Sequence, residues 1–157
     1  MLKLSVICYL DNGKEFLMLY RNKKEQDMHE GKWVSVGGKF EIGESPEECA
    51  IREIKEETGL TVTKLNYQGV ITFPCFTEET DWYSFVYRVK EYEGNLLKEC
   101  DEGTLKWVPY EKLYSLPMWE GDYKFLNWIL EGKTPFSAKF YYGKQDELLD
   151  YDVTFYE

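Results

Sequence analysis

Apolar residues are concentrated along this chain in short runs rich in β-branched and aromatic side chains, separated by turn or charged residues. Runs of this kind are typical of β-strands. The Asp11-Asn12-Gly13 turn between the first two runs predicts a hairpin, because Asn-Gly supplies the positive φ angles of a tight turn. We therefore expect strands at residues 2–10, 15–20, 33–36, 61–76, 82–92 and 103–110, and two shorter ones around Gly143.

Helix signals gather at one place in the sequence. Ser45 is a good N-cap, Pro46 suits the first helical position, Glu48 would close a capping box, and Gly59 is a typical C-terminal stop. A second helix is expected at residues 122–130. Because strands outnumber helices and both helices have one apolar face, the pattern predicts an α+β domain in which helices pack on a mixed sheet.

The first helix carries an unusual group of acidic residues. At 100° per residue, Glu53, Glu56 and Glu57 fall within an arc of about 100°, beside the apolar stripe that would pack on the sheet (Ala50, Ile51, Ile54 and Thr58). Each like-charged pair costs about 0.2–0.5 kcal/mol. Arg52 can pair with Glu56, but one guanidinium cannot balance several carboxylates. A hard divalent cation could, and the carbonyl groups of the preceding Gly37 and Gly38 are further candidate ligands.

Charge and composition narrow the function classes. The 157 residues carry a net charge of −10, so a basic surface that binds nucleic acid is not expected, although a phosphate-bearing small molecule held through metal ions is compatible with this charge. The four cysteines form no C-x-x-C pair and are expected to be reduced thiols. No segment approaches the ~20 apolar residues of a membrane helix. We expect one domain over residues 1–157, no membrane association and a cytoplasmic location.

These positions resemble a known motif. The fixed positions of the Nudix box, G-x5-E-x7-R-E-U-x-E-E-x-G-U with U a bulky aliphatic residue, are all filled between residues 38 and 60, by Gly38, Glu44, Arg52, Glu53, Ile54, Glu56, Glu57, Gly59 and Leu60. The chain is therefore similar to the Nudix hydrolases. The resemblance implies an α/β/α sandwich and the cleavage of a nucleoside diphosphate linked to another group, with Mg²⁺ or Mn²⁺.

The resemblance also implies roles for individual residues. Glu53, Glu56 and Glu57 would be metal ligands, joined by the backbone carbonyl of Gly37 or Gly38. Arg52 would orient a glutamate of the box, and Glu44 would support the cluster. Outside the box, Glu102 is the best candidate for a further acid at the metal. Either Glu53 or Glu102 could deprotonate the attacking water.

Beyond the box, the chain is similar to the MutT-like branch and to its oxidised-purine nucleoside triphosphatases. That similarity implies cleavage of a nucleoside triphosphate, such as the oxidised purine nucleotide 8-oxo-dGTP, to a monophosphate and pyrophosphate. Candidate stacking residues for the base are Trp33, Phe73 and Trp119, each equally compatible with core packing. Asp122 could read the base edge or cap the second helix. Val34 stands where that branch has an asparagine, and its side chain cannot form a hydrogen bond, so a different or weaker base selectivity is expected.

Lys39 is a candidate phosphate contact, as are Arg21 and Lys23, whereas His29 is expected to be a loop residue rather than a metal ligand. Two alternatives stay open. The chain could hydrolyse another nucleoside diphosphate derivative, such as ADP-ribose or a dinucleotide, or it could be a non-catalytic module that senses nucleotides. In each case the expected partner is a small-molecule nucleotide, and the protein would be a monomer or a homodimer.

Overall fold

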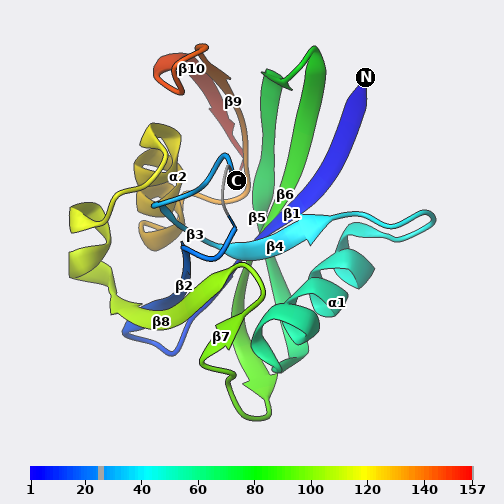
Figure 1. The fold of residues 1–157 in the computed structure, drawn as a ribbon, viewed down its shortest axis with the longest axis vertical. Coiled ribbons are helices and arrows are strands. Elements are labelled where there is room, and N and C mark those ends of the chain that lie inside the picture. Colours follow the sequence, from blue (N-terminus) through cyan, green and yellow to red (C-terminus); the bar gives the residue numbers. More distant parts are fainter. Residues whose placement is uncertain (25–26, 157) are drawn as a thin grey trace.

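The computed structural model describes residues 1–24 and 27–156, which form two β-sheets and two α-helices (Figure 1). The larger sheet contains six strands in the order β10 (Leu148–Phe155), β9 (Phe136–Tyr142), β5 (Thr61–Thr77), β6 (Thr80–Glu93), β1 (Leu2–Leu10) and β4 (Val36–Lys39). The smaller sheet contains four strands in the order β3 (Trp33–Val34), β2 (Glu15–Arg21), β8 (Gly103–Pro109) and β7 (Glu99–Cys100).

The larger sheet is mixed, as the sequence predicted. β1 runs parallel to β6 and β5 runs parallel to β9, whereas the other neighbours are antiparallel. Helix α1 (Pro46–Thr58) packs against β4 and β1. Helix α2 (Glu120–Leu130) lies on the other side of the molecule (Figure 1), where Phe125, Leu126 and Ile129 join a core cluster with residues of β1, β2 and β9. A short 3-10 helix, η1 (Tyr110–Ser115), precedes it. The helices and the mixed sheet confirm the α+β class.

The prediction of a hairpin at residues 2–20 is wrong. β1 and β2 lie in different sheets, and a single bridge, Asp11 to Phe16, joins the two sides of the turn. Gly13 does adopt a positive φ of 96°. β1 instead pairs along its whole length with β6, from Leu2 opposite Asp81 to Leu10 opposite Val89. The turn therefore transfers the chain between sheets, and β1 is paired on both sides, with β6 and with β4.

The strand expected at residues 33–36 is two strands, because the chain crosses between the sheets at Ser35. β4, which follows this crossing, contains the two glycines of the predicted site. Gly37 has a φ of 148°, and a Cβ atom there would lie 2.1 Å from the carbonyl oxygen of Val6. Only glycine fits this close approach of β4 to β1, which holds the Gly37-Gly38 backbone beside α1.

The predicted N-terminus and C-terminus of α1 are confirmed. The side chain of Ser45 accepts a hydrogen bond from the Glu48 N–H at 3.1 Å, and the Glu48 carboxylate accepts one from the Ser45 N–H at 2.9 Å, which completes the capping box. Gly59 ends the helix in the left-handed conformation at a φ of 79°. The helix is thus fixed by local signals at both ends.

The buried face of α1 differs from the prediction at one position. Ala50, Ile54 and Thr58 are buried, but Ile51 is 42% exposed. The packed stripe is rotated toward the acidic side of the helix, so that Glu57 is buried as well. The Glu57 carboxylate therefore faces the sheet more directly than the hydrophobic pattern indicated. Neither helix in the described part of the chain is long and apolar enough to span a membrane.

Candidate active site

Arg52 binds three carboxylates of the box, those of Glu44, Glu53 and Glu56. Its guanidinium donates two hydrogen bonds to Glu44, from Nε at 2.6 Å and from Nη2 at 2.9 Å. Nη1 donates to Glu53 at 2.9 Å and to Glu56 at 3.3 Å. Nη2 also donates to the carbonyl of Lys39 at 3.0 Å. The two bonds from Arg52 to Glu44, with a further one from the Glu41 N–H, hold the pKa of Glu44 down to about 2, so Glu44 is ionised and fixes Arg52 in return.

Glu57 lies beneath the β4 backbone. Its Oε1 accepts a hydrogen bond from the Gly37 N–H at 2.7 Å, while its Oε2 is buried and has no hydrogen-bond partner among the described residues. The side chain is only 7% exposed. Burial raises the pKa of Glu57, and the charges of Glu102 and Glu53 raise it further. A buried carboxylate oxygen without a partner is costly unless a cation faces it.

Glu53 lies against Gly38, whose missing side chain leaves the space that the carboxylate fills. A Cβ atom at Gly38 would be 2.4–2.6 Å from all three atoms of the Glu53 carboxylate group. Burial raises the pKa of Glu53, although the hydrogen bond from Arg52 opposes this effect. Because Gly38 has no side chain, its backbone lies close to the Glu53 carboxylate, so both could contact the same cation.

These features fit a divalent metal ion. The oxygen donors are hard and crowd together, and the buried Oε2 of Glu57 has no hydrogen-bond partner among the described residues. The raised pKa values of Glu53 and Glu57 show that their ionised forms are disfavoured unless a cation is bound. In residues 1–24 and 27–156, however, no three His, Cys, Asp or Glu side chains are close enough to form a ready metal-binding group. Glu56 accounts for this in part, because its side chain is 58% exposed and is paired with Arg52. Joint binding by all three glutamates would require Glu56 to leave that pair.

Glu102 reaches the same region from the turn between β7 and β8. Its side chain is 30% exposed and forms ion pairs with Arg21 at 3.4 Å and Lys24 at 3.7 Å. Its charge also contributes to the raised pKa of Glu57. The structure thus places the acid expected outside the box beside the acids of the box.

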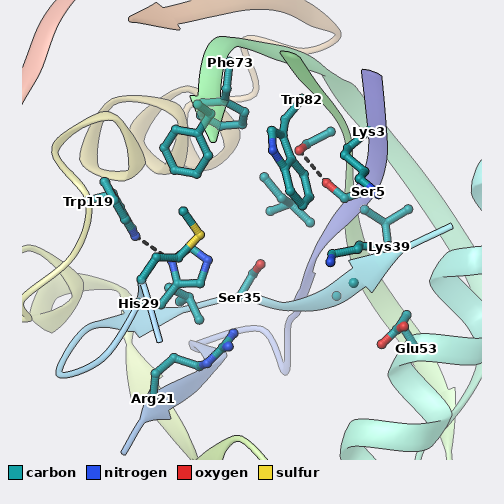
Figure 2. Close-up of a pocket in the computed structure, with 18 of the residues that line it drawn as sticks. Lys3, Ser5, Arg21, His29, Ser35, Lys39, Glu53, Phe73, Trp82 and Trp119 are labelled. Carbon is teal, nitrogen blue, oxygen red and sulfur yellow. Dashed lines mark hydrogen bonds between the residues drawn. The ribbon is translucent and has the colours of Figure 1, made fainter. Parts of the chain in front are cut away.

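A cavity of about 910 Å³ connects the carboxylates of Glu53 and Glu102 to an aromatic region. Figure 2 shows Glu53 at one end of this cavity, with Trp119 and Phe73 on the far side. Eleven predicted site residues line it: Arg21, Val34, Gly37, Gly38, Lys39, Arg52, Glu53, Phe73, Glu102, Trp119 and Asp122. Glu44, Glu56, Glu57, Lys23 and Trp33 are not among its lining residues.

The structure does not bring Trp33 or Lys23 to the cavity, for geometric reasons. Side chains alternate along a strand, so in β3 Val34 faces the cavity while Trp33 points away and packs on Tyr20, with ring centroids 4.9 Å apart. Lys23 turns outward and pairs with Glu99 at 3.1 Å. Neither Trp33 nor Lys23 is therefore positioned to contact a ligand in the cavity.

Asp122 does not cap the second helix. Helix α2 begins at Glu120, and the N-cap residue, Trp119, makes no side-chain capping bond. Asp122 lies in the first turn and lines the cavity. Burial raises its pKa to about 8, against the opposing charge of Lys32, so this carboxyl group is mainly protonated at neutral pH and can donate a hydrogen bond.

The sequence missed several residues of the aromatic region. Phe76 and Tyr142 pack on Trp119, with ring centroids at 5.3 and 5.1 Å, and Trp82 lies on the opposite wall near Lys39 (Figure 2). His29 also lines the cavity and contacts Trp119. Aromatic residues in strands have ordinary core roles, so no local signal distinguished these from packing residues.

Comparison with known proteins agrees with this geometry. The NUDIX domain profile matches residues 1–129. The chain belongs to the Nudix family. It is 32% identical to the Bacillus subtilis protein YvcI, described as an uncharacterized Nudix hydrolase, over 92% of this chain and 89% of that protein. It is also 32% identical to the oxidized purine nucleoside triphosphate hydrolase of Danio rerio, over 83% of this chain and 82% of that protein.

Solved Nudix structures place the chain in the MutT-like group. The MutT protein from Bacillus halodurans superposes with a TM-score of 0.86 at 31% identity, covering 96% of this chain and 97% of that one. The ADP-ribose complex of the NUDIX domain of Shewanella oneidensis NrtR shares the fold alone, with a TM-score of 0.66 at 14% identity. The chain is therefore a MutT-like Nudix pyrophosphohydrolase. Nudix hydrolases generally use a divalent metal ion and act on small-molecule nucleotides.

Proposed function

We propose that this protein hydrolyses a nucleoside triphosphate to a nucleoside monophosphate and pyrophosphate in the presence of Mg²⁺ or Mn²⁺, and that oxidised purine nucleotides such as 8-oxo-dGTP are its substrates. The observation that carries the proposal is one cavity that joins Glu53 and Arg52 of the box to an aromatic pocket containing Asp122, whose carboxyl group is mainly protonated at neutral pH. The similarity to oxidized purine nucleoside triphosphate hydrolases supports the choice of substrate. Such a substrate would come from the cytoplasmic nucleotide pool.

In this proposal, Glu53, Glu56 and Glu57 hold the metal with a backbone carbonyl of Gly37 or Gly38. When bound, the metal ion neutralises phosphate charge and activates a water molecule. Glu102 lies beside Glu57 and could complete the acidic group. Either Glu53 or Glu102 would accept the proton of the attacking water, since the carboxylates of both line the cavity.

Other side chains fix these groups and the substrate. Arg52 positions Glu44 and Glu53 through its forked hydrogen bonds. Lys39 is the cation best placed for a phosphate oxygen, because it lines the cavity beside Gly38, whereas Arg21 is already paired with Asp27 at 2.9 Å.

Phe73 would contact the base, and Asp122 would donate a hydrogen bond to its edge. Val34 would limit the depth of the pocket without reading the base, since its side chain is apolar and nearly buried. The pocket therefore supplies apolar contact around a small number of polar groups, which is the usual composition of a specific ligand site.

A substrate panel tests this proposal. The purified protein would be incubated with Mg²⁺ and with dGTP, 8-oxo-dGTP, dATP, 2-oxo-dATP and ADP-ribose, and the products would be quantified by chromatography. We expect the highest kcat/KM for an oxidised purine triphosphate. Preferential hydrolysis of ADP-ribose would overturn the substrate assignment, and nucleotide binding without turnover in Mg²⁺ would indicate a sensing module instead.

A further inference from the structure

His29 makes a specific contact with Trp119 across the base end of the cavity. The two residues are 90 positions apart, His29 in the connection between β2 and β3 and Trp119 just before α2. The Trp119 Nε1–H donates a hydrogen bond to His29 Nδ1 at 2.7 Å, and the rings meet edge-on at an interplanar angle of 79°. Figure 2 shows this bond and the imidazole beside the cavity, above Arg21.

This bond determines which nitrogen of His29 carries the proton. An indole N–H can only donate, so Nδ1 must be the acceptor and a neutral imidazole then has its hydrogen on Nε2. Burial lowers the pKa of His29 to about 4; the charges of Arg21 and Lys32 lower it further, while those of Asp27 and Glu102 oppose them. His29 is therefore neutral at physiological pH, and its Nε2–H is a fixed donor.

Trp119 itself has little surface to offer a ligand. Its side chain is enclosed by Phe76, Tyr142 and the Lys32 ammonium group, which lies 4.8 Å from the ring centroid, and the residue is only 5% exposed. His29 is less deeply buried and lines the cavity. In the described part of the chain, no group accepts a hydrogen bond from its Nε2. The polar atom that this cluster presents to a ligand is therefore on His29 rather than on Trp119.

We propose that His29 is a positioning residue for the base of the nucleotide: Nδ1 holds the Trp119 indole, and the Nε2–H donates a hydrogen bond to an acceptor atom on the base edge. This inference rests on the proposed function in one respect, that the cavity binds a nucleotide. With Asp122, the wall then offers two neutral donors to the base. The class of ligand it selects is a base that presents a carbonyl oxygen or an unprotonated ring nitrogen to this wall.

Two substitutions by amide side chains distinguish the roles of the two nitrogen atoms of His29. In His29→Asn, the side-chain oxygen can replace Nδ1 as the acceptor for Trp119, but the Nε2–H donor is lost. In His29→Gln, the amide N–H can reach the Nε2 position and restore the donor. His29→Leu removes both groups, and Glu30→Gln, a change at an exposed residue of the same loop outside the cavity lining, is the matched control.

The variants would be assayed with dGTP and with 2-deoxyribose 5-triphosphate, which has the phosphates but no base. A neutral hydrogen bond corresponds to a change of about 3–10-fold. For dGTP we expect KM to rise by about this factor in His29→Asn and by more in His29→Leu, with little change in kcat, and His29→Gln to recover most of the loss. For the base-free probe, the KM values of His29→Asn, His29→Gln and His29→Leu should agree with one another within about 2-fold.

Two results would overturn the role of His29: unchanged KM for dGTP in His29→Asn and His29→Leu, or equal losses on dGTP and on the base-free probe, which would indicate a structural effect only. Failure of the proposed function looks different, because neither probe would then be hydrolysed by the unmodified protein. In that case, the Kd for dGTP would be measured by calorimetric titration for the unmodified protein and the His29 variants. Kd values that rise in the order expected for KM would support the role of His29 in binding the base, and equal Kd values would overturn it.

Discussion

Replacement of Gly38 by alanine is expected to inactivate the enzyme while leaving its fold intact. The added Cβ atom would lie 2.4–2.6 Å from the Glu53 carboxylate, and Gly38 does not have a positive φ, so its backbone accepts alanine. The flexible end of Glu53 must then move by about 1 Å to reach an ordinary contact distance. A displacement of about 1 Å in a catalytic group can reduce the rate by about 100-fold.

The same substitution should have a small effect on stability. The contact at risk is the Arg52–Glu53 ion pair at 2.9 Å, whose side chains are 21% and 15% exposed. Ion pairs near the surface contribute about 0.2–1 kcal/mol, and for a chain of this size 1 kcal/mol shifts Tm by about 2–4 °C. We therefore expect a fall in Tm of less than about 4 °C, measured by circular dichroism, beside a fall of about 100-fold in kcat/KM.

Gly43→Ala is the matched control. Nothing lies within 4 Å of a Cβ at Gly43, but its φ of 82° is unfavourable for alanine. This variant should lose about 1–2 kcal/mol of stability and keep its kcat/KM per folded molecule. If Gly38→Ala retained kcat/KM within about 2-fold of the unmodified protein, our account of Gly38 as the space for Glu53 would be refuted.

Three further substitutions test the site. Burial raises the pKa of Glu57 to about 9, so the folded state keeps a proton that the unfolded state releases, and the metal-free protein should lose stability as the pH rises from about 5 to about 9. Glu57→Gln should remove most of this pH dependence of Tm and also the increase in Tm caused by Mg²⁺. Arg52→Lys cannot reproduce the forked bonds to Glu44, so kcat/KM should fall by roughly 100-fold, and wild-type activity would show that the fork is dispensable. Asp122 has a pKa of about 8, so kcat/KM for a purine triphosphate should decline above that pH as the donor ionises; Asp122→Asn keeps a donor and should give a flat profile, whereas an unchanged decline would assign the ionisation to another group.

The parts of the fold that depend on neighbouring residues were predictable. Helix α1 begins and ends where Ser45, Glu48 and Gly59 indicated, because capping bonds involve residues three or four positions apart. The spacing of the box likewise predicted that Glu44 and Glu53 lie near Arg52, which donates hydrogen bonds to both.

The parts that depend on distant pairing were not predictable. The Asn-Gly turn gave its positive φ but no hairpin, because β1 pairs with β6 from the middle of the chain. Trp33 was expected at the cavity beside Val34 but packs on Tyr20, because the sequence did not determine which face of a two-residue strand meets the cavity. The bond between His29 and Trp119 joins two loop positions that no local pattern relates.

The most direct measurement of the proposed reaction is the stoichiometry of its products. With dGTP and Mg²⁺, the account predicts that nucleoside monophosphate and pyrophosphate appear in equal amounts, and that both disappear when the metal is chelated and return when Mg²⁺ is restored. Release of inorganic phosphate with a nucleoside diphosphate, or turnover that survives chelation, would contradict it.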